Sequence, residues 1–292
     1  MLGEVITAVV TPFAPDGAVD VDAFARLARH LVDHGSDGLV VAGTTGESPT
    51  LSDEEKLELF AAAKDAVGDQ ATIIAGTGTY DTAHSVHLTE QAAKLGVDGI
   101  LVVTPYYNKP PQRAIVRHFE EIAAQTDKPV MAYNIPARVV VDIEPATIAR
   151  LAEIDNVVAV KQAHDDLDEA RFIAQETRLD LYSGDDNLTL DFLGLGGVGV
   201  VSVIAHVWGE QMKQMIRAHA DGDPDTARAL NDELQPAYEL LRVTTNPIAI
   251  KTALGLLGHD VGGFRLPMVD ASAEELAEIR DCLSRGGVPV AA

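Results

Sequence analysis

The amino-acid sequence predicts an α/β protein, in which a closed (β/α)8 TIM barrel is followed by a smaller all-helical domain. Two observations carry this prediction. Short runs of β-branched residues alternate with helix-like segments as far as residue 203, and only helix-like segments follow. Regular alternation of strands and helices indicates βαβ units and a parallel sheet. Eight such units within about 200 residues favour a closed barrel over an open sheet.

The predicted strands are the eight short apolar runs that open the repeating units. They are Val5–Thr11, Leu39–Ala42, Thr72–Ala75, Gly99–Thr104, Val130–Asn134, Val157–Lys161, Leu179–Ser183 and Val198–Val203. Such runs suit strands that are buried on both faces. Between them, apolar residues three and four positions apart predict helices, as at Phe24, Leu27 and Leu31. The pattern from Ser52 to Glu55 is that of a capping box, which predicts a helix beginning after Ser52.

The segment beyond the last predicted strand is expected to be entirely helical. Its predicted helices are Val207–His219, Pro224–Leu241, Ile248–Leu257 and Ala273–Leu283. The turn residues Asp221-Gly222-Asp223-Pro224 interrupt the chain between the first two helices. We therefore predict a catalytic barrel over residues 1–224 and a helical C-terminal domain over residues 225–292.

The overall composition excludes several classes of protein. The formal net charge of −23 argues against nucleic acid or an anionic membrane surface as a partner. A single cysteine, Cys282, excludes a disulfide or a cysteine metal cluster within one chain, which fits a reducing compartment. The first residues lack the features of a signal peptide, and no apolar run approaches transmembrane length. We expect a soluble, cytoplasmic protein.

Lys161 is the first candidate catalytic residue, because it ends a predicted buried strand. Desolvating a lysine is unfavourable, so a lysine at such a position calls for an explanation. Partial burial lowers the pKa of an amine and frees its lone pair to attack a carbonyl, which makes Lys161 a candidate Schiff-base nucleophile. The alternative is a strand-end lysine whose amine reaches solvent.

Polar residues gather at the carboxyl ends of five predicted strands, which is the end that carries the chemistry in barrels of this type. They are Gly43–Ser48, Thr104–Pro110, Tyr133–Arg138, Lys161 and Ser183–Asp186. Each has a purely structural alternative. The glycines can make a tight turn, the tyrosines can belong to the core, and Arg138 can be a surface residue. For Asp185 and Asp186, a helix N-cap is favoured over a metal site. The occurrence of all five at one end of the barrel favours an active site.

Other mechanisms have less support in the sequence. Gly76-Thr77-Gly78 lacks the third glycine of a dinucleotide-binding motif, and there is no P-loop. The nine histidines lack the HExxH spacing of a zinc site, and no nucleophile-elbow serine is present. We therefore expect neither a catalytic metal nor a nucleotide cofactor. His164 is expected at a helix start, although it could contact the site.

Six short motifs together resemble the dihydrodipicolinate synthase family of pyruvate-dependent class I aldolases and lyases. They are GTTGES at 43–48, PYYNKP at 105–110, YNIPAR at 133–138, VKQA at 160–163, SGDD at 183–186 and NPI at 246–248. The resemblance runs along nearly the whole chain. It implies a (β/α)8 barrel with a C-terminal helical domain, a homotetramer built as a dimer of dimers, and no cofactor apart from pyruvate bound covalently as a substrate.

The same resemblance implies four catalytic residues. Lys161 would form the Schiff base with pyruvate, and Tyr133 would move protons. Thr44 would link Tyr133 to Tyr107, which would come from a neighbouring subunit.

The resemblance also implies the residues that bind the substrates. Thr45 and the backbone around Val201 would hold pyruvate, and Arg138 would hold the carboxylate of L-aspartate 4-semialdehyde. Gly184 and Asp185 would complete the binding site.

Three functions remain open at this point. The first is condensation of pyruvate with L-aspartate 4-semialdehyde, which Arg138 favours. The related sugar-acid aldolases generally lack an arginine at this position, because their second substrate is a neutral polyol. The second is a pyruvate-forming aldolase acting on a sugar-derived 2-keto acid, and the third is a non-catalytic sensor of an α-keto acid. Two segments, 139–141 and 162–165, depart from the family pattern and flank the second-substrate side.

Regulation by lysine is predicted to be weak or absent. Lysine-inhibited members commonly have a glutamate and an asparagine at an interface site, and the matching positions here hold His84 and Tyr80. Asp53 and Lys56 stand where histidines often occur. The carboxylate that would meet the lysine ammonium is therefore missing from its usual position.

Overall fold

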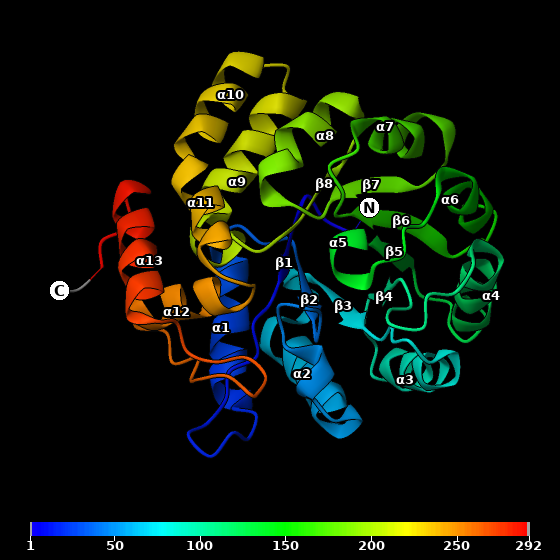
Figure 1. Cartoon of the computed structure of the whole chain (residues 1–292), viewed down its shortest axis with the longest axis horizontal. Coiled ribbons are helices and arrows are strands. Elements are labelled where there is room, and N and C mark those ends of the chain that lie inside the picture. Colours follow the sequence, from blue (N-terminus) through cyan, green and yellow to red (C-terminus); the bar gives the residue numbers. More distant parts are fainter. Residues whose placement is uncertain (1, 291–292) are drawn as a thin grey trace.

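The computed structural model describes residues 2–290 and confirms the predicted fold class. Eight parallel strands, β1 to β8, pair in chain order, and β8 closes the barrel against β1. Helices connect successive strands and surround the barrel (Figure 1). Each connecting helix returns the chain to the end of the barrel where the strands begin. All eight strands therefore run in the same direction, and their carboxyl ends lie at one rim.

The strands agree closely with the predicted runs. They are β1 Val5–Ala8, β2 Gly38–Val41, β3 Thr72–Gly76, β4 Gly99–Val103, β5 Val130–Asn134, β6 Val157–Gln162, β7 Asp180–Ser183 and β8 Gly199–Ser202. The largest difference is at β1, which ends three residues before the predicted Thr11. Residues 9–11 are buried but lie outside β1. The predicted strand was too long because an apolar pattern indicates burial and not strand pairing.

The helices around the barrel follow the strands in turn. They are α1 Val21–Asp33, α2 Asp53–Val67, α3 Thr82–Lys94, α4 Gln112–Ala123, α5 Pro136–Val139, α6 Pro145–Leu151, α7 Leu167–Glu176, α8 Thr189–Leu195 and α9 Ala205–Ala220. Short 3-10 helices cover Ser48–Thr50, Gly68–Gln70 and Asp186–Leu188. The predicted capping box is confirmed, because Ser52 and Glu55 bond reciprocally across the first turn of α2.

Two layers of apolar side chains hold the barrel together. Residues that point outward from the strands pack against the helices, and those that point inward, including Ile6, Met131 and Tyr182, fill the barrel interior. Successive side chains alternate between these layers. In β6, Ala159 therefore belongs to the inner cluster and Val160 to the outer one, which directs the next residue, Lys161, inward.

The C-terminal helices gather at one side of the barrel, where Figure 1 shows them beside α1 and α9. They are α10 Pro224–Glu233, α11 Gln235–Val243, α12 Ile248–Leu256 and α13 Ala273–Arg285. The prediction of one helix over residues 224–241 was wrong. The chain breaks at Leu234 because Pro236, which has no backbone N–H to donate, fits only the first turn of a new helix. The domain boundary near residue 224 stays a prediction.

Within residues 2–290, no helix combines the length and the apolar character that crossing a membrane requires.

Candidate active site

The pairing of β5 with β6 places Lys161 beside Tyr133. The two residues are partners in the register of these strands, so both side chains project inward at the same level of the barrel. Lys161 Nζ lies 4.2 Å from the centroid of the Tyr133 ring. Both residues are buried, with 5% and 4% of their surface exposed. The alternative of a lysine reaching into solvent is therefore wrong, and the amine instead lies next to a phenol that could exchange protons with it.

A cavity of about 650 Å³ opens above this pair. Seven of the predicted site residues line it: Thr44, Thr45, Tyr133, Arg138, Lys161, Gly184 and Asp185. A smaller adjoining cavity of about 220 Å³ shares Thr44, Tyr133 and Arg138 with it. Four of the five predicted strand-end segments thus supply polar groups to this cavity, and the fifth, after β4, contributes Tyr106 to the smaller one.

Two predicted residues lie elsewhere. Tyr107 does not reach the cavity of its own chain, because it is 92% exposed on the loop after β4. Its backbone is left-handed, with φ of 68°, which is an unfavourable conformation for a tyrosine. Val201 is fully buried in β8, where its side chain belongs to the apolar cluster inside the barrel.

The loop after β7 differs from the helix cap that was expected. The Asp185 side chain makes no capping bond to the following 3-10 helix. The Asp186 carboxylate instead accepts hydrogen bonds from the Ser202 hydroxyl and from the N–H groups of Val203 and Ile204, which ties β7 to the loop after β8. Asp185 thus occupies the N-cap position of the 3-10 helix, but its side chain makes no capping bond and faces the cavity instead.

Gly184 and Asp185 shape this side of the cavity in different ways. A Cβ at Gly184 would lie 2.6 Å from the Cβ of Ala163, so only glycine allows β6 and the β7 loop to approach this closely. Burial raises the pKa of Asp185, while the positive charge of Lys161 opposes the shift. Arg138 and His164 oppose it as well, so three cationic side chains act on this carboxyl.

Comparison with known proteins decides the family. The model of the dihydrodipicolinate synthetase family matches residues 1–285. The chain belongs to this family. A 4-hydroxy-tetrahydrodipicolinate synthase from Moorella thermoacetica is 52% identical over 98% of this chain and 99% of its own. A lysine-bound crystal structure from Cyanidioschyzon merolae has a TM-score of 0.97 at 44% identity, with 99% of each chain covered. The structure from Acinetobacter baumannii in complex with pyruvate has a TM-score of 0.96 at 34% identity, covering 99% and 100%.

Asn246 makes contacts at this site that the sequence did not predict. The Asn246 amide donates to Thr45 Oγ1 at 2.9 Å, and its backbone carbonyl accepts a bond of 3.4 Å from Arg138 Nη2. Asn246 belongs to the NPI motif, which signalled the segment but not its contacts. A residue from the C-terminal helical region thus fixes two groups at the rim of the barrel.

A second buried lysine was also missed. Lys251, in α12, donates to Glu47 of the GTTGES motif at 2.9 Å, and both side chains are excluded from solvent. Lys251 Nζ also lies 4.3 Å from the ring centroid of Phe13. A lone lysine within the apolar run 248–256 was a usable signal. Because Lys251 lines neither cavity described above, we interpret the pair as a structural tie between α12 and the β2 loop.

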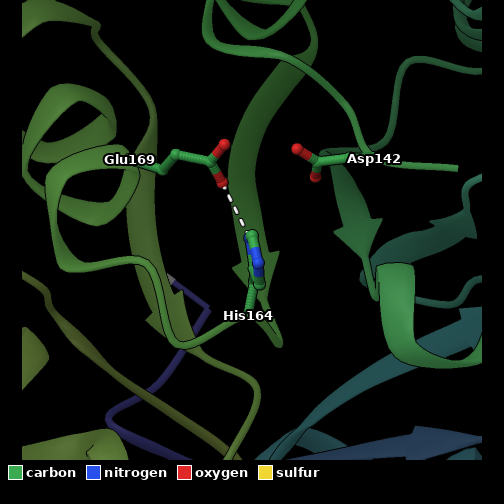
Figure 2. Close-up of side chains that lie close together, drawn as sticks. All are labelled: Asp142, His164 and Glu169. Atoms are coloured by element: carbon green, nitrogen blue, oxygen red, sulfur yellow. Dashed lines mark hydrogen bonds and ion pairs between the residues drawn. The ribbon is translucent and has the colours of Figure 1, made fainter.

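One group of side chains in residues 2–290 has a composition that could hold a metal ion. Ligand atoms of Asp142, His164 and Glu169 all lie within 4.8 Å of one another. Figure 2 shows the three side chains directed toward a common space. His164 Nδ1 and Glu169 Oε2 are already hydrogen-bonded to each other at 2.9 Å. His164 was expected at a helix start, but α7 begins at Leu167 and is capped by Asp166. His164 instead lines the 650 Å³ cavity.

Proposed function

We propose that this protein condenses pyruvate with L-aspartate 4-semialdehyde to give 4-hydroxy-tetrahydrodipicolinate, a step in the biosynthesis of diaminopimelate and lysine. The observation that carries the proposal is the buried amine of Lys161, in register with Tyr133 and sharing a cavity with Arg138. Relatives that are 49–52% identical are named 4-hydroxy-tetrahydrodipicolinate synthase. The single cysteine, Cys282, fits a reducing compartment, which supports action in the cytoplasm.

The chemistry needs one nucleophilic amine and a route for protons. Lys161 Nζ attacks C2 of pyruvate, and loss of water gives a protonated imine. The imine draws electrons from the methyl group, which loses a proton to form an enamine. The enamine carbon attacks the aldehyde carbon of the second substrate, whose oxygen takes up a proton. The substrate amine then adds to C2 and displaces Lys161, which closes the ring and frees the enzyme. No external cofactor enters these steps.

Tyr133 is placed to carry these protons, because its ring lies directly against the amine. Thr44 lines both cavities together with Tyr133. Positioned acid–base groups of this kind contribute about 10²–10⁴ in rate. Thr44 would pass protons between Tyr133 and the partner subunit's Tyr107 in a homotetramer made of two dimers.

Substrate binding divides between two sides of the cavity. The Thr45 hydroxyl accepts a hydrogen bond from Asn246, so its own proton is free for the pyruvate carboxylate. The backbone around Val201 would hold the rest of pyruvate. Arg138 suits the carboxylate of the semialdehyde, because a guanidinium can bind a carboxylate with two parallel bonds. Gly184 lets the β7 loop lie close to Ala163 at this side of the cavity, and Asp185 suits the ammonium group of the same substrate.

The experiment that tests the proposal is a substrate panel. Purified protein with pyruvate and L-aspartate 4-semialdehyde is expected to turn over, and sugar-derived 2-keto acids are expected to release no pyruvate. The contrary pattern would support the sugar-acid aldolase. Binding of pyruvate without turnover or borohydride trapping would support the sensor.

Replacing Tyr107 with phenylalanine is expected to slow turnover about 10²-fold or more while leaving pyruvate trapping by borohydride in place, because only a relay hydroxyl is lost. The measurement is kcat in the assembled oligomer, verified by sedimentation. Tyr80→Phe removes another exposed tyrosine hydroxyl and serves as the matched control. Unchanged kinetics in Tyr107→Phe would remove this residue from the relay.

Sub-millimolar L-lysine is expected to leave turnover nearly unchanged. His84 Nε2 lies 2.8 Å from the Asp53 carboxylate and Lys56 Nζ lies 3.7 Å from it. The carboxylate in this cluster is therefore already paired with two basic groups and has little capacity for a lysine ammonium. The measurement is the initial rate against lysine concentration at fixed pH. Strong inhibition in that range would show the prediction to be wrong.

A further inference from the structure

His164 provides a basic group in the active-site cavity that the proposed chemistry has not yet used. It lies three residues after Lys161, in the segment where the chain departs from the family pattern, and it lines the same 650 Å³ cavity as Arg138 and Asp185. Its side chain is half-buried. The nitrogen Nδ1 is bound to Glu169. The nitrogen Nε2 lies 3.9 Å from the exposed Asp165 carboxylate, beyond hydrogen-bond distance, so it can still bind another partner.

A hydrogen-bonded chain fixes the position of Glu169 and therefore of His164. Glu169 Oε2 accepts from Gln162 Nε2 at 3.1 Å, and Gln162 Oε1 accepts from Asn134 Nδ2 at 3.1 Å. Asn134 Nδ2 also donates to Asp142 at 2.6 Å. Gln162 and Asn134 directly follow Lys161 and Tyr133 on β6 and β5, and their side chains point to the opposite face of the same strands. The strands that orient the reacting pair thus also orient His164.

The charges around His164 favour its cationic form. Figure 2 shows the carboxylates of Asp142 and Glu169 directed toward one another with the imidazole beside them. Two facing carboxylates repel, and a positive charge next to them relieves this repulsion. Burial lowers the pKa of His164, but the hydrogen bond and charge of Glu169, with the charges of Asp142 and Asp165, outweigh burial and raise it.

His164 and Arg138 act on the same part of the cavity, because the charges of both oppose the raised pKa of Asp185. The lining of the cavity therefore includes the cationic groups of Arg138 and His164 together with the carboxyl groups of Asp165 and Asp185. A zwitterionic amino-acid end, with one carboxylate and one ammonium, matches this arrangement better than a neutral polyol does.

We propose that His164 binds the carboxylate of L-aspartate 4-semialdehyde together with Arg138, and that Glu169 positions its ring for this contact. The proposal rests on the proposed function, since it assigns a residue to the second substrate of that reaction. His164 is a specificity-determining residue, and Glu169 is a positioning residue that acts through it.

The test compares His164→Gln with His87→Gln, which changes an exposed histidine on α3. A hydrogen bond to a charged group contributes about 1.5–3 kcal/mol, so His164→Gln is expected to raise KM for the semialdehyde by about 10- to 100-fold. KM for pyruvate and the trapping of pyruvate by borohydride should stay within about twofold of wild type, which also shows that the variant folds. His87→Gln should match wild type in every measurement.

The pH dependence separates binding from a purely structural role. Because the pKa of His164 is raised, its charge persists below that pKa and is lost as pH rises through it. KM for the semialdehyde should therefore rise with pH in wild type and lose this dependence in His164→Gln. In Glu169→Gln the rise should begin at lower pH, because the nearest carboxylate that stabilises the cation has been removed. Asp142, Asp165 and Asp185 face the same ring and remain in both variants.

Three outcomes would overturn the proposal. An unchanged KM for the semialdehyde in His164→Gln, with wild type active, would remove His164 from substrate binding and leave the proposed function intact. Absence of turnover in wild type with the semialdehyde would overturn both. A fall in wild-type activity with EDTA, restored by Zn²⁺ and absent in Glu169→Gln, would identify the Asp142, His164 and Glu169 cluster as a metal site instead.

Discussion

Replacing Lys161 with alanine is expected to leave a folded barrel that no longer traps pyruvate. Without Nζ, no imine can form, and borohydride has no bond to reduce. Turnover should fall by a factor on the order of 10⁶, the loss found when another enzyme is deprived of its covalent nucleophile. The measurements are mass spectrometry of the protein after borohydride with labelled pyruvate, and kcat/KM with both substrates.

Two lysines serve as references for this experiment. Lys94→Ala removes an exposed amine from α3 and should keep full trapping and turnover. Lys251 is buried as deeply as Lys161 but pairs with Glu47 and lines neither active-site cavity, so peptide mapping of wild type should show no label on it. Label retained in Lys161→Ala, or found mainly on another lysine, would contradict the assignment of the nucleophile.

Replacing Lys251 with methionine should cause the largest loss of stability among these variants. The change leaves the Glu47 carboxylate buried, and within residues 2–290 the backbone N–H of Arg265, at 3.2 Å, is the one hydrogen-bond donor that remains for its side chain. Breaking a buried ion pair on one side lowers the free energy of unfolding by about 3–5 kcal/mol. Urea unfolding at one fixed protein concentration measures the effect, since association with other subunits also contributes to stability.

Two comparisons show whether this loss comes from an unpaired buried charge. Adding Glu47→Gln to Lys251→Met should recover part of the stability, because the second change removes the charge that was left without a partner. Arg150→Met breaks the exposed ion pair with Glu153 and should cost less than about 1 kcal/mol. An equally small effect in Lys251→Met would show that the pair does not hold α12 to the β2 loop.

Most of the barrel was predictable because its signals are local. Each strand is a short apolar run that is buried on both faces, and each helix carries its own periodicity and caps, as in the bonds between Ser52 and Glu55. The proximity of Lys161 and Tyr133 was predictable for a related reason. Each lies at or next to the carboxyl end of such a run, and in a parallel barrel all strands end at one rim.

Errors arose where a local pattern had two solutions. The periodicity of residues 224–241 suited one helix, but Pro236 divides it into two. Two aspartates at the start of a short helix suited a side-chain cap, but Asp185 makes no capping bond. The Asp186 carboxylate instead accepts hydrogen bonds from Ser202 and Val203, on a neighbouring strand and the loop after it. Local propensity is a weak preference, and tertiary hydrogen bonds readily outweigh it.

The sequence by itself determined the order of strands and helices, the rim that carries the chemistry, and the amine and phenol at its centre. Only the tertiary structure decided which distant residues support them: Asn246 on Thr45, Lys251 on Glu47, and Glu169 on His164. The physical reason is that periodicity and caps depend on neighbours within a few positions, whereas a hydrogen bond between residues 201 or 204 positions apart forms only when packing brings them together.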